Sequence, residues 1–175
     1  DKGAEPVLGT WVDVNQVISE LVRMSLDTLF LPNKVNVQID LDPGLGSILT
    51  QRDQLKQVLL NLAKNAVEAM PRGGKLSFAT TRAEHGGQRS AVITVQDTGT
   101  GLPEHVRQQL FQPAVSTKGG EHAGLGLYIS SNLVKSMGGD IECDSSPSGS
   151  TFRIYLPMAE TAHNAAVSQP GSQRK

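Results

Sequence analysis

Two carboxamides and one carboxylate form a polar stripe along a helix predicted over 51–70. Asn61, Asn65 and Glu68 follow one another at i, i+4 and i+7, which brings them together at about 100° of rotation per residue. The stripe runs beside an apolar face that consists of Leu55, Leu59, Leu62, Ala66, Ala69 and Met70. Such oxygens suit Mg²⁺, which takes one or two protein oxygens and completes its shell with water and phosphates. The Asn-x-x-x-Asn spacing is common, so this helix taken alone is better explained as a solvated face.

A second candidate for ligand chemistry lies at the end of a strand predicted over 91–96. Asp97 follows this strand directly, and Gly99 and Gly101 come next. A carboxylate in this place can accept a hydrogen bond from a ligand amine, and the glycines let the backbone approach the ligand closely. A plain Asp-Thr-Gly turn without a ligand is the commoner use of so short a motif.

A third candidate is the glycine-rich run Gly124-Leu125-Gly126-Leu127, which opens a helix predicted over 126–137. The free N–H groups and the positive dipole end of a helix N-terminus bind anions. The run Ser116-Thr117-Lys118-Gly119-Gly120 precedes it and has the composition of a loop that closes over phosphates. An ordinary surface connection would contain the same glycines, but the loop lysine next to a glycine-opened helix favours phosphate. The chain contains no Walker A sequence.

The elements that must hold these residues alternate between helix and strand. Helices are predicted over 14–30, 51–70, 103–110 and 126–137, the first capped by Asp13 and the second opened by a Thr50-x-x-Asp53 capping signature. Strands are predicted over 10–12, 34–41, 47–49, 75–82, 91–96, 140–144 and 151–156. Three main helices and at least five strands predict an α/β (α+β) fold, a two-layer sandwich.

Composition narrows the class of protein further. The 175 residues fit one domain over 10–158, with a linker over 1–9 and a disordered tail over 159–175. The net charge of −1 argues against a nucleic-acid partner and against direct membrane contact through a basic patch. The single cysteine, Cys143, excludes an internal disulfide and a multi-cysteine zinc site. No apolar run is long enough to span a bilayer, and a chain that starts without Met is expected to be a fragment.

Six motifs that are weak singly occur in one order. They are Asn61-Leu-x-x-Asn65-Ala-x-Glu68-Ala, Asp97-x-Gly99-x-Gly101, Phe111-Gln112-Pro113, Ser116-Thr117-Lys118, Gly124-Leu125-Gly126-Leu127 and Gly149-Ser150-Thr151-Phe152. This run, over about Val12 to Pro157, resembles the catalytic, ATP-binding domain of bacterial sensor histidine kinases, in the superfamily that also holds gyrase, Hsp90 and MutL. The resemblance implies a Bergerat fold, with a mixed, mostly antiparallel sheet of about five strands, three main helices and a flexible ATP lid.

The resemblance implies ATP and Mg²⁺ as cofactors and assigns catalytic and binding roles to particular residues. Asn65 would be the main Mg²⁺ ligand, Asn61 would support the metal or the phosphates, and Lys118 would hold phosphates as the third catalytic residue. Asp97 would accept the adenine amino group, and Thr151 would support the base pocket near it. The remaining nucleotide contacts would come from Gly99, Gly101, Leu102, Ser116, Thr117, Gly124, Leu125, Gly126 and Leu127, with Phe111 as the lid anchor.

The chain also departs from the pattern of the family. Many members carry Lys and an aromatic residue where this sequence has Glu68 and Ala69, and the usual second aromatic of the lid is replaced by Ala114. We therefore expect adenine to be recognised mainly through Asp97 and aliphatic contacts. Hydrolases of the superfamily use a Glu one turn before the metal-binding Asn, and this chain has Asn61 there. Because an amide cannot take the proton of water, the resemblance favours phosphoryl transfer to a protein side chain.

The four histidines, His85, His105, His122 and His163, are expected to be surface residues, so the acceptor histidine is expected in an upstream dimerisation domain outside this chain. A response regulator would be the downstream partner, and the fragment would be a cytoplasmic part of a larger sensor kinase, either soluble or membrane-anchored. Two alternatives remain open at this point. They are a serine-directed kinase of the anti-sigma type and a non-catalytic nucleotide-binding module of the same fold.

Overall fold

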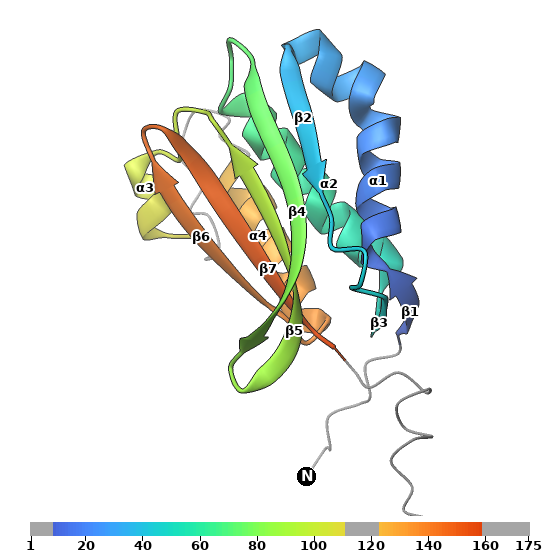
Figure 1. Cartoon of the computed structure of the whole chain (residues 1–175). Coiled ribbons are helices and arrows are strands. Elements are labelled where there is room, and N and C mark those ends of the chain that lie inside the picture. Colours follow the sequence, from blue (N-terminus) through green and yellow to red (C-terminus); the bar gives the residue numbers. More distant parts are fainter. Residues whose placement is uncertain (1–8, 111–122, 159–175) are drawn as a thin grey trace, which may run out of the picture.

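The main sheet is mixed and carries its helices on one face (Figure 1). The computed structural model describes residues 9–110 and 123–158. The sheet has the strand order β2 (Val35–Asp40), β4 (Gly74–His85), β5 (Gln88–Asp97), β7 (Gly149–Pro157) and β6 (Asp140–Ser146). β2 runs parallel to β4, and all other neighbouring strands are antiparallel. This arrangement confirms the predicted two-layer sandwich with a mostly antiparallel sheet of five strands.

Three main helices form the second layer, and they are α1 (Val14–Ser25), α2 (Arg52–Glu68) and α4 (Ala123–Ser136). The short helix α3 (Glu104–Gln108) lies beside β6, and β1 (Thr10–Asp13) pairs with β3 (Ser47–Thr50) in a separate antiparallel ribbon (Figure 1). Residues 1–8, 111–122 and 159–175 lie outside the described residues. They include most of the predicted linker, the predicted lid over 113–123 except Ala123, and the predicted tail. Within the described part of the chain, no helix combines the length and apolarity needed to cross a membrane.

The core lies between the sheet and the helices, and strand alternation decides which residues enter it. In β7, Ser150, Phe152 and Ile154 are buried, whereas the residues between them face outward. In β5, Ile93, Val95 and Asp97 face the same way as these residues, because Ile93 is paired with Ile154 and Val95 with Phe152. The apolar face predicted for α2 is buried at Leu55, Leu59, Leu62 and Ala66. The polar stripe of α2 therefore lies at the edge of this core.

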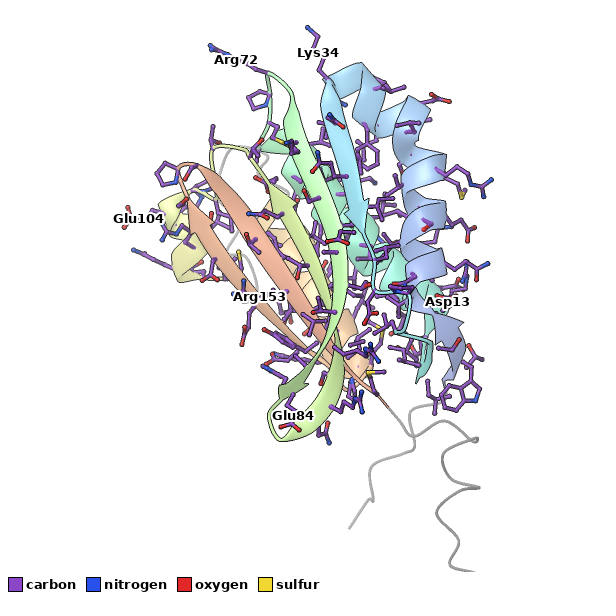
Figure 2. The ribbon with its side chains drawn as sticks, in the orientation of Figure 1. Asp13, Lys34, Arg72, Glu84, Glu104 and Arg153 are labelled. Carbon is purple, nitrogen blue, oxygen red and sulfur yellow. The ribbon has the colours of Figure 1, made fainter. Side chains whose placement is uncertain are left out.

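Helix ends follow the predictions only in part. Asp13 stands where β1 passes into α1, and its Oδ1 accepts the Gln16 N–H at 3.1 Å, which confirms this cap (Figure 2). The predicted cap of α2 is wrong, because Thr50 is a buried residue of β3 and Gln51 occupies the N-cap position, where its side chain makes no capping hydrogen bond. The α-helix α1 ends at Ser25, and a π turn and a 3₁₀ turn continue to Asn33. α4 begins at Ala123, three residues before the predicted start.

Candidate functional site

Asp97 is held in a fixed orientation at the end of β5. Its side chain is 6% exposed, and Oδ1 accepts the Gly99 N–H at 2.9 Å and the Ser150 N–H at 3.3 Å. Burial raises the pKa of this carboxyl group, and the two backbone hydrogen bonds act in the opposite direction. Within 9–110 and 123–158, both hydrogen bonds to this carboxylate converge on Oδ1. Oδ2 is therefore the oxygen that remains as an acceptor for a ligand.

The glycines around Asp97 allow the protein chain to pack closely against itself. A Cβ atom at Gly99 would lie 2.4 Å from the Ala69 carbonyl oxygen, and one at Gly149 would lie 2.2 Å from the Asp97 carbonyl oxygen. Gly101 has a φ of +80°, and a Cβ atom there would lie 2.1 Å from the carbonyl oxygen of Ser146. These contacts explain the glycines by packing, and their expected closeness to an adenine base stays a prediction.

Gly101→Ala is expected to destabilise the fold by about 2 kcal/mol or more, because it adds a backbone clash to the strain of a positive φ. Gly86→Ala is the matched control, since Gly86 has a φ of +57° and open space where its Cβ would be. We expect that control to cost only about 1 kcal/mol. Urea unfolding of both variants measures the difference, and equal costs would contradict the close approach of Gly101 to Ser146.

Two serines that the sequence analysis did not single out connect the Asp97 loop to the β6–β7 hairpin. The Ser145 hydroxyl oxygen accepts the Leu102 N–H at 2.8 Å and lies 2.8 Å from the Ser150 hydroxyl oxygen. Ser150 is buried and donates its backbone N–H to Asp97. The alternation of residues in the strand after Gly149 could have indicated the inward position of Ser150, because residues 150 and 152 lie on the same face.

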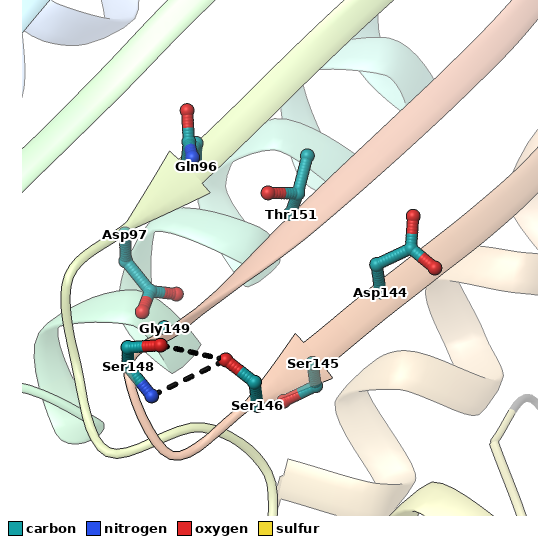
Figure 3. A pocket seen from close by; sticks show the side chains of 8 residues that line it. All are labelled: Gln96, Asp97, Asp144, Ser145, Ser146, Ser148, Gly149 and Thr151. Carbon is teal, nitrogen blue, oxygen red and sulfur yellow. Dashed lines mark hydrogen bonds between the residues drawn. The ribbon is translucent and has the colours of Figure 1, made fainter.

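Thr151 lies on the opposite face of the sheet from Ser150, since it is paired with Gln96 and is only partly buried. Together with Gln96 it borders a polar pocket of about 240 Å³ at the end of the strands, which Figure 3 shows. The other lining residues are Asp97, Asp144, Ser145, Ser146, Ser148 and Gly149. Ser150, and not Thr151, therefore shares the inward face with Asp97.

The helix stripe meets the start of α4 in a second pocket, of about 320 Å³. Its lining residues are Gln57, Asn61, Lys64, Asn65, Glu68, Gly126 and Ile129. The structure thus brings Asn61, Asn65 and Gly126 together, as expected. A Cβ atom at Gly126 would meet nothing within 4 Å, so this glycine leaves open space at the pocket. Among the described residues, the Nδ2 atom of Asn65 is buried without a hydrogen-bond partner.

The amides, the carboxylate and the open glycine of this second pocket fit a hydrated Mg²⁺ that carries phosphates. Lys64 adds a positive charge at the rim. Leu127 is buried in the core, so only its backbone can serve a ligand. Gly124 and Leu125 belong to α4, and the expected lid residues Phe111, Ser116, Thr117 and Lys118 lie outside the described residues.

The C-terminal end of α2 links the Asp97 loop to Asn65. The Ala69 N–H donates to the Asn65 carbonyl at 3.0 Å, and the Ala69 carbonyl in turn accepts the Thr100 N–H at 3.0 Å. Gly99 packs against the same carbonyl. A Cβ atom at Gly99 would also lie only 2.9 Å from the Ala69 Cβ, so this contact requires glycine at position 99. The Asp97 loop and the helical turn that holds Asn65 are therefore joined by backbone contacts.

Cys143 is a half-buried strand residue, as the sequence analysis expected. Burial, followed by the nearby carboxylates of Asp144 and Asp97, raises the pKa of its thiol to about 12. The side chain borders a pocket of about 420 Å³ between α3 and β6. A thiol that stays protonated is a poor nucleophile, and this agrees with a plain strand residue at position 143.

A sandwich with a mostly antiparallel sheet, a strand-end carboxylate, a glycine loop and an amide-bearing helix is the arrangement expected of a nucleotide-binding domain. Residues 50–160 match the family described as histidine kinase-, DNA gyrase B-, and HSP90-like ATPases. The match covers more than half of the chain, and the protein belongs to this family. The predicted resemblance to the ATP-binding domain of a sensor histidine kinase is confirmed.

Individual relatives agree with this assignment. The chain is 39% identical to the sensory histidine kinase/phosphatase NtrB of Escherichia coli O157:H7 over 142 residues, which are 77% of this chain and 40% of NtrB. The catalytic domain of histidine kinase ThkA superposes with a TM-score of 0.71 at 26% identity, over 86% of this chain and 98% of ThkA. Full-length ShkA in complex with AMPPNP superposes with a TM-score of 0.71 at 28% identity, over 91% of this chain and 33% of ShkA. The chain spans about two fifths of the length of NtrB.

Proposed function

We propose that this chain binds Mg-ATP and donates the γ-phosphoryl group to a histidine of a separate phosphoacceptor domain of the same protein. The observation that carries the proposal is the backbone path from the Asp97 loop through Ala69 to the helical turn of α2 that holds Asn65. This link supports a single ligand that reaches from a base-recognising group to a metal-binding group. Similarity to NtrB supports histidine as the acceptor, because that relative is a sensory histidine kinase.

At the base end, Asp97 Oδ2 accepts a hydrogen bond from the adenine amino group. Gly99, Gly101 and Leu102 form the wall of the base pocket, and the Ser145–Ser150 pair holds that wall in place through the Leu102 N–H. We assign the supporting role beside Asp97 to Ser150 in place of Thr151, because Ser150 shares the inward face and its N–H reaches the carboxylate.

At the phosphate end, Asn65 is the residue that would hold Mg²⁺, and Glu68 and Lys64 border the same pocket. When bound, the cation would neutralise phosphate charge. The N–H groups of the first turn of α4, over 124–127, would hold the phosphates from the other side. Ser116, Thr117 and Lys118 of the lid complete the proposed set.

The absence of a carboxylate at position 61 favours transfer over hydrolysis. Asn61 lies one turn before Asn65, where a general base for water would have to stand, and an amide cannot take that proton. Positioning and charge neutralisation suffice for transfer to a side chain that is presented from outside. ATP as the donor favours the cytoplasm, and a response regulator is the partner that we propose downstream.

Neither histidine of the described residues is a good acceptor. His85 lies 2.9 Å from Asp140 through Nε2 and stacks on Tyr155 with ring centroids 3.8 Å apart, so its ring is already engaged. His105 lies on the five-residue helix α3. The proposed acceptor therefore belongs to another domain, through which the whole protein would dimerise.

Transfer of label from [γ-³²P]ATP to a supplied acceptor domain tests the reaction. We expect Mg²⁺-dependent labelling of a histidine, recognised because phosphohistidine is lost in acid and survives in base. An acid-stable phosphoserine would support the serine-directed alternative. Binding of ATP without any labelling of acceptor domains would support the non-catalytic module instead.

A further inference from the structure

The amide of Asn61 is engaged by the protein at both of its polar atoms. Gln57 Nε2 donates to Asn61 Oδ1 at 2.9 Å, and Asn61 Nδ2 donates to the Ser130 hydroxyl oxygen at 3.3 Å. If the side-chain amides of Gln57 and Asn61 were both rotated by 180°, donors and acceptors would be exchanged, but both polar atoms of Asn61 would still form hydrogen bonds. The contrast is with Asn65, one turn later, whose Nδ2 has no partner among the described residues.

The bond to Ser130 joins α2 to α4 at the pocket that Asn65 and Gly126 border. Ser130 is fully buried and lies four residues after Gly126, which is about one helical turn. A shift of α4 along α2 would therefore move the glycine turn relative to Asn65. A second polar link, from the Ser136 hydroxyl to Gln54 Oε1 at 2.7 Å, joins the same two helices outside the pocket.

We propose that Asn61 is a positioning residue and not a metal ligand. Gln57 and Ser130 hold its amide so that it fixes the first turn of α4, the phosphate-facing turn, at a set distance from Asn65. This inference rests on the proposed function, because it assigns the phosphate end of a bound nucleotide to this pocket. Asn65 then remains as the carboxamide that serves the cation, through its Oδ1 atom, and Gln57 and Ser130 become residues of the site that act through Asn61.

Calorimetric titration of the chain with ATP, once with MgCl₂ and once with EDTA, tests the assignment. Loss of a positioning hydrogen bond in Ser130→Ala is expected to weaken Mg-ATP binding about threefold to tenfold. The enhancement of affinity by Mg²⁺ should stay at the wild-type value, because Asn65 is untouched. Asn61→Ala should behave in the same way, and Asn65→Ala should lose the enhancement.

Three further variants separate positioning from general stability. Ser136→Ala removes the other link between α2 and α4, and Ser131→Ala removes a hydroxyl of a neighbouring buried serine. Both should bind Mg-ATP like the wild type. Gln57→Ala changes an exposed residue, so it tests the network even if Ser130→Ala folds poorly, and it should weaken Mg-ATP binding in the same direction.

Wild-type affinity in Ser130→Ala and Gln57→Ala would overturn the inference, and so would loss of the Mg²⁺ enhancement in Asn61→Ala. Either result would leave the proposed function standing, because wild-type binding would be intact. A wild-type chain that binds no Mg-ATP would overturn both.

Discussion

Asp97→Asn is expected to weaken ATP binding about tenfold to a hundredfold, since a hydrogen bond to a charged group is worth about 1.5–3 kcal/mol. The variant can keep an oxygen for the N–H groups of Gly99 and Ser150. Its amide nitrogen then replaces Oδ2 and presents a donor to the donating amino group of adenine. Calorimetric titration of ATP in Mg²⁺ measures the loss, and unchanged affinity would contradict the assignment of Asp97.

The same substitution should not harm the fold, which separates a role in recognition from a role in structure. The pKa of Asp97 is raised by burial, so the folded protein binds this proton more tightly than the unfolded chain does. Ionisation of this carboxyl group therefore lowers the free energy of unfolding. The loss grows as the pH rises from the pKa in the unfolded chain to the pKa in the folded protein, and it is complete above the folded-state pKa. At pH 7 the variant should melt at or above the wild-type temperature. Joint loss of binding and stability would mean that Asp97 serves the fold.

Asn65→Ala is expected to remove the effect of Mg²⁺ and to lower phosphoryl transfer about a hundredfold or more, because the cation supplies several kcal/mol of charge stabilisation. Binding of ATP in EDTA should change little, since the base end of the site is intact. The measurement is the ratio of ATP affinities with and without Mg²⁺, together with the rate of labelling of an acceptor domain.

Asn132→Ala is the control for Asn65→Ala, because it removes an exposed asparagine of α4 and should leave the ratio and the rate unchanged. If Asn65→Ala kept the wild-type ratio, the metal would have to be held elsewhere. If it lost binding in EDTA as strongly as in Mg²⁺, Asn65 would act on the fold or on the base.

The parts of the site that lie within one element could be predicted from the sequence. The stripe of Asn61 and Asn65 follows from helical periodicity alone, and Asp97 is placed at a strand end by the apolar run before it. The two-layer architecture follows from the alternation of these elements. The link between α2 and the Asp97 loop could not be predicted, because the contact from Ala69 to Thr100 joins residues 31 positions apart through backbone atoms.

One prediction was wrong, and another is revised, where a local pattern had two uses. Thr50 fits a capping signature, but pairing with Thr10 extends β3 to this residue and moves the cap to Gln51. Thr151 and Ser150 are adjacent hydroxyl residues of one motif, and only the register of β7 against β5 decides which of them faces Asp97. The roles of Ser130 and Gln57 could not be predicted from the sequence, because they depend on how α2 packs against α4.

We propose that one Mg-ATP is held between Asp97 and Asn65 of this domain. Titration of the wild-type chain with ATP by calorimetry tests it most directly, with circular dichroism as the check that the chain is folded. We expect one ATP to bind per chain, with an affinity that rises on addition of Mg²⁺. A folded chain that gives no saturable binding with millimolar ATP and Mg²⁺ would contradict it.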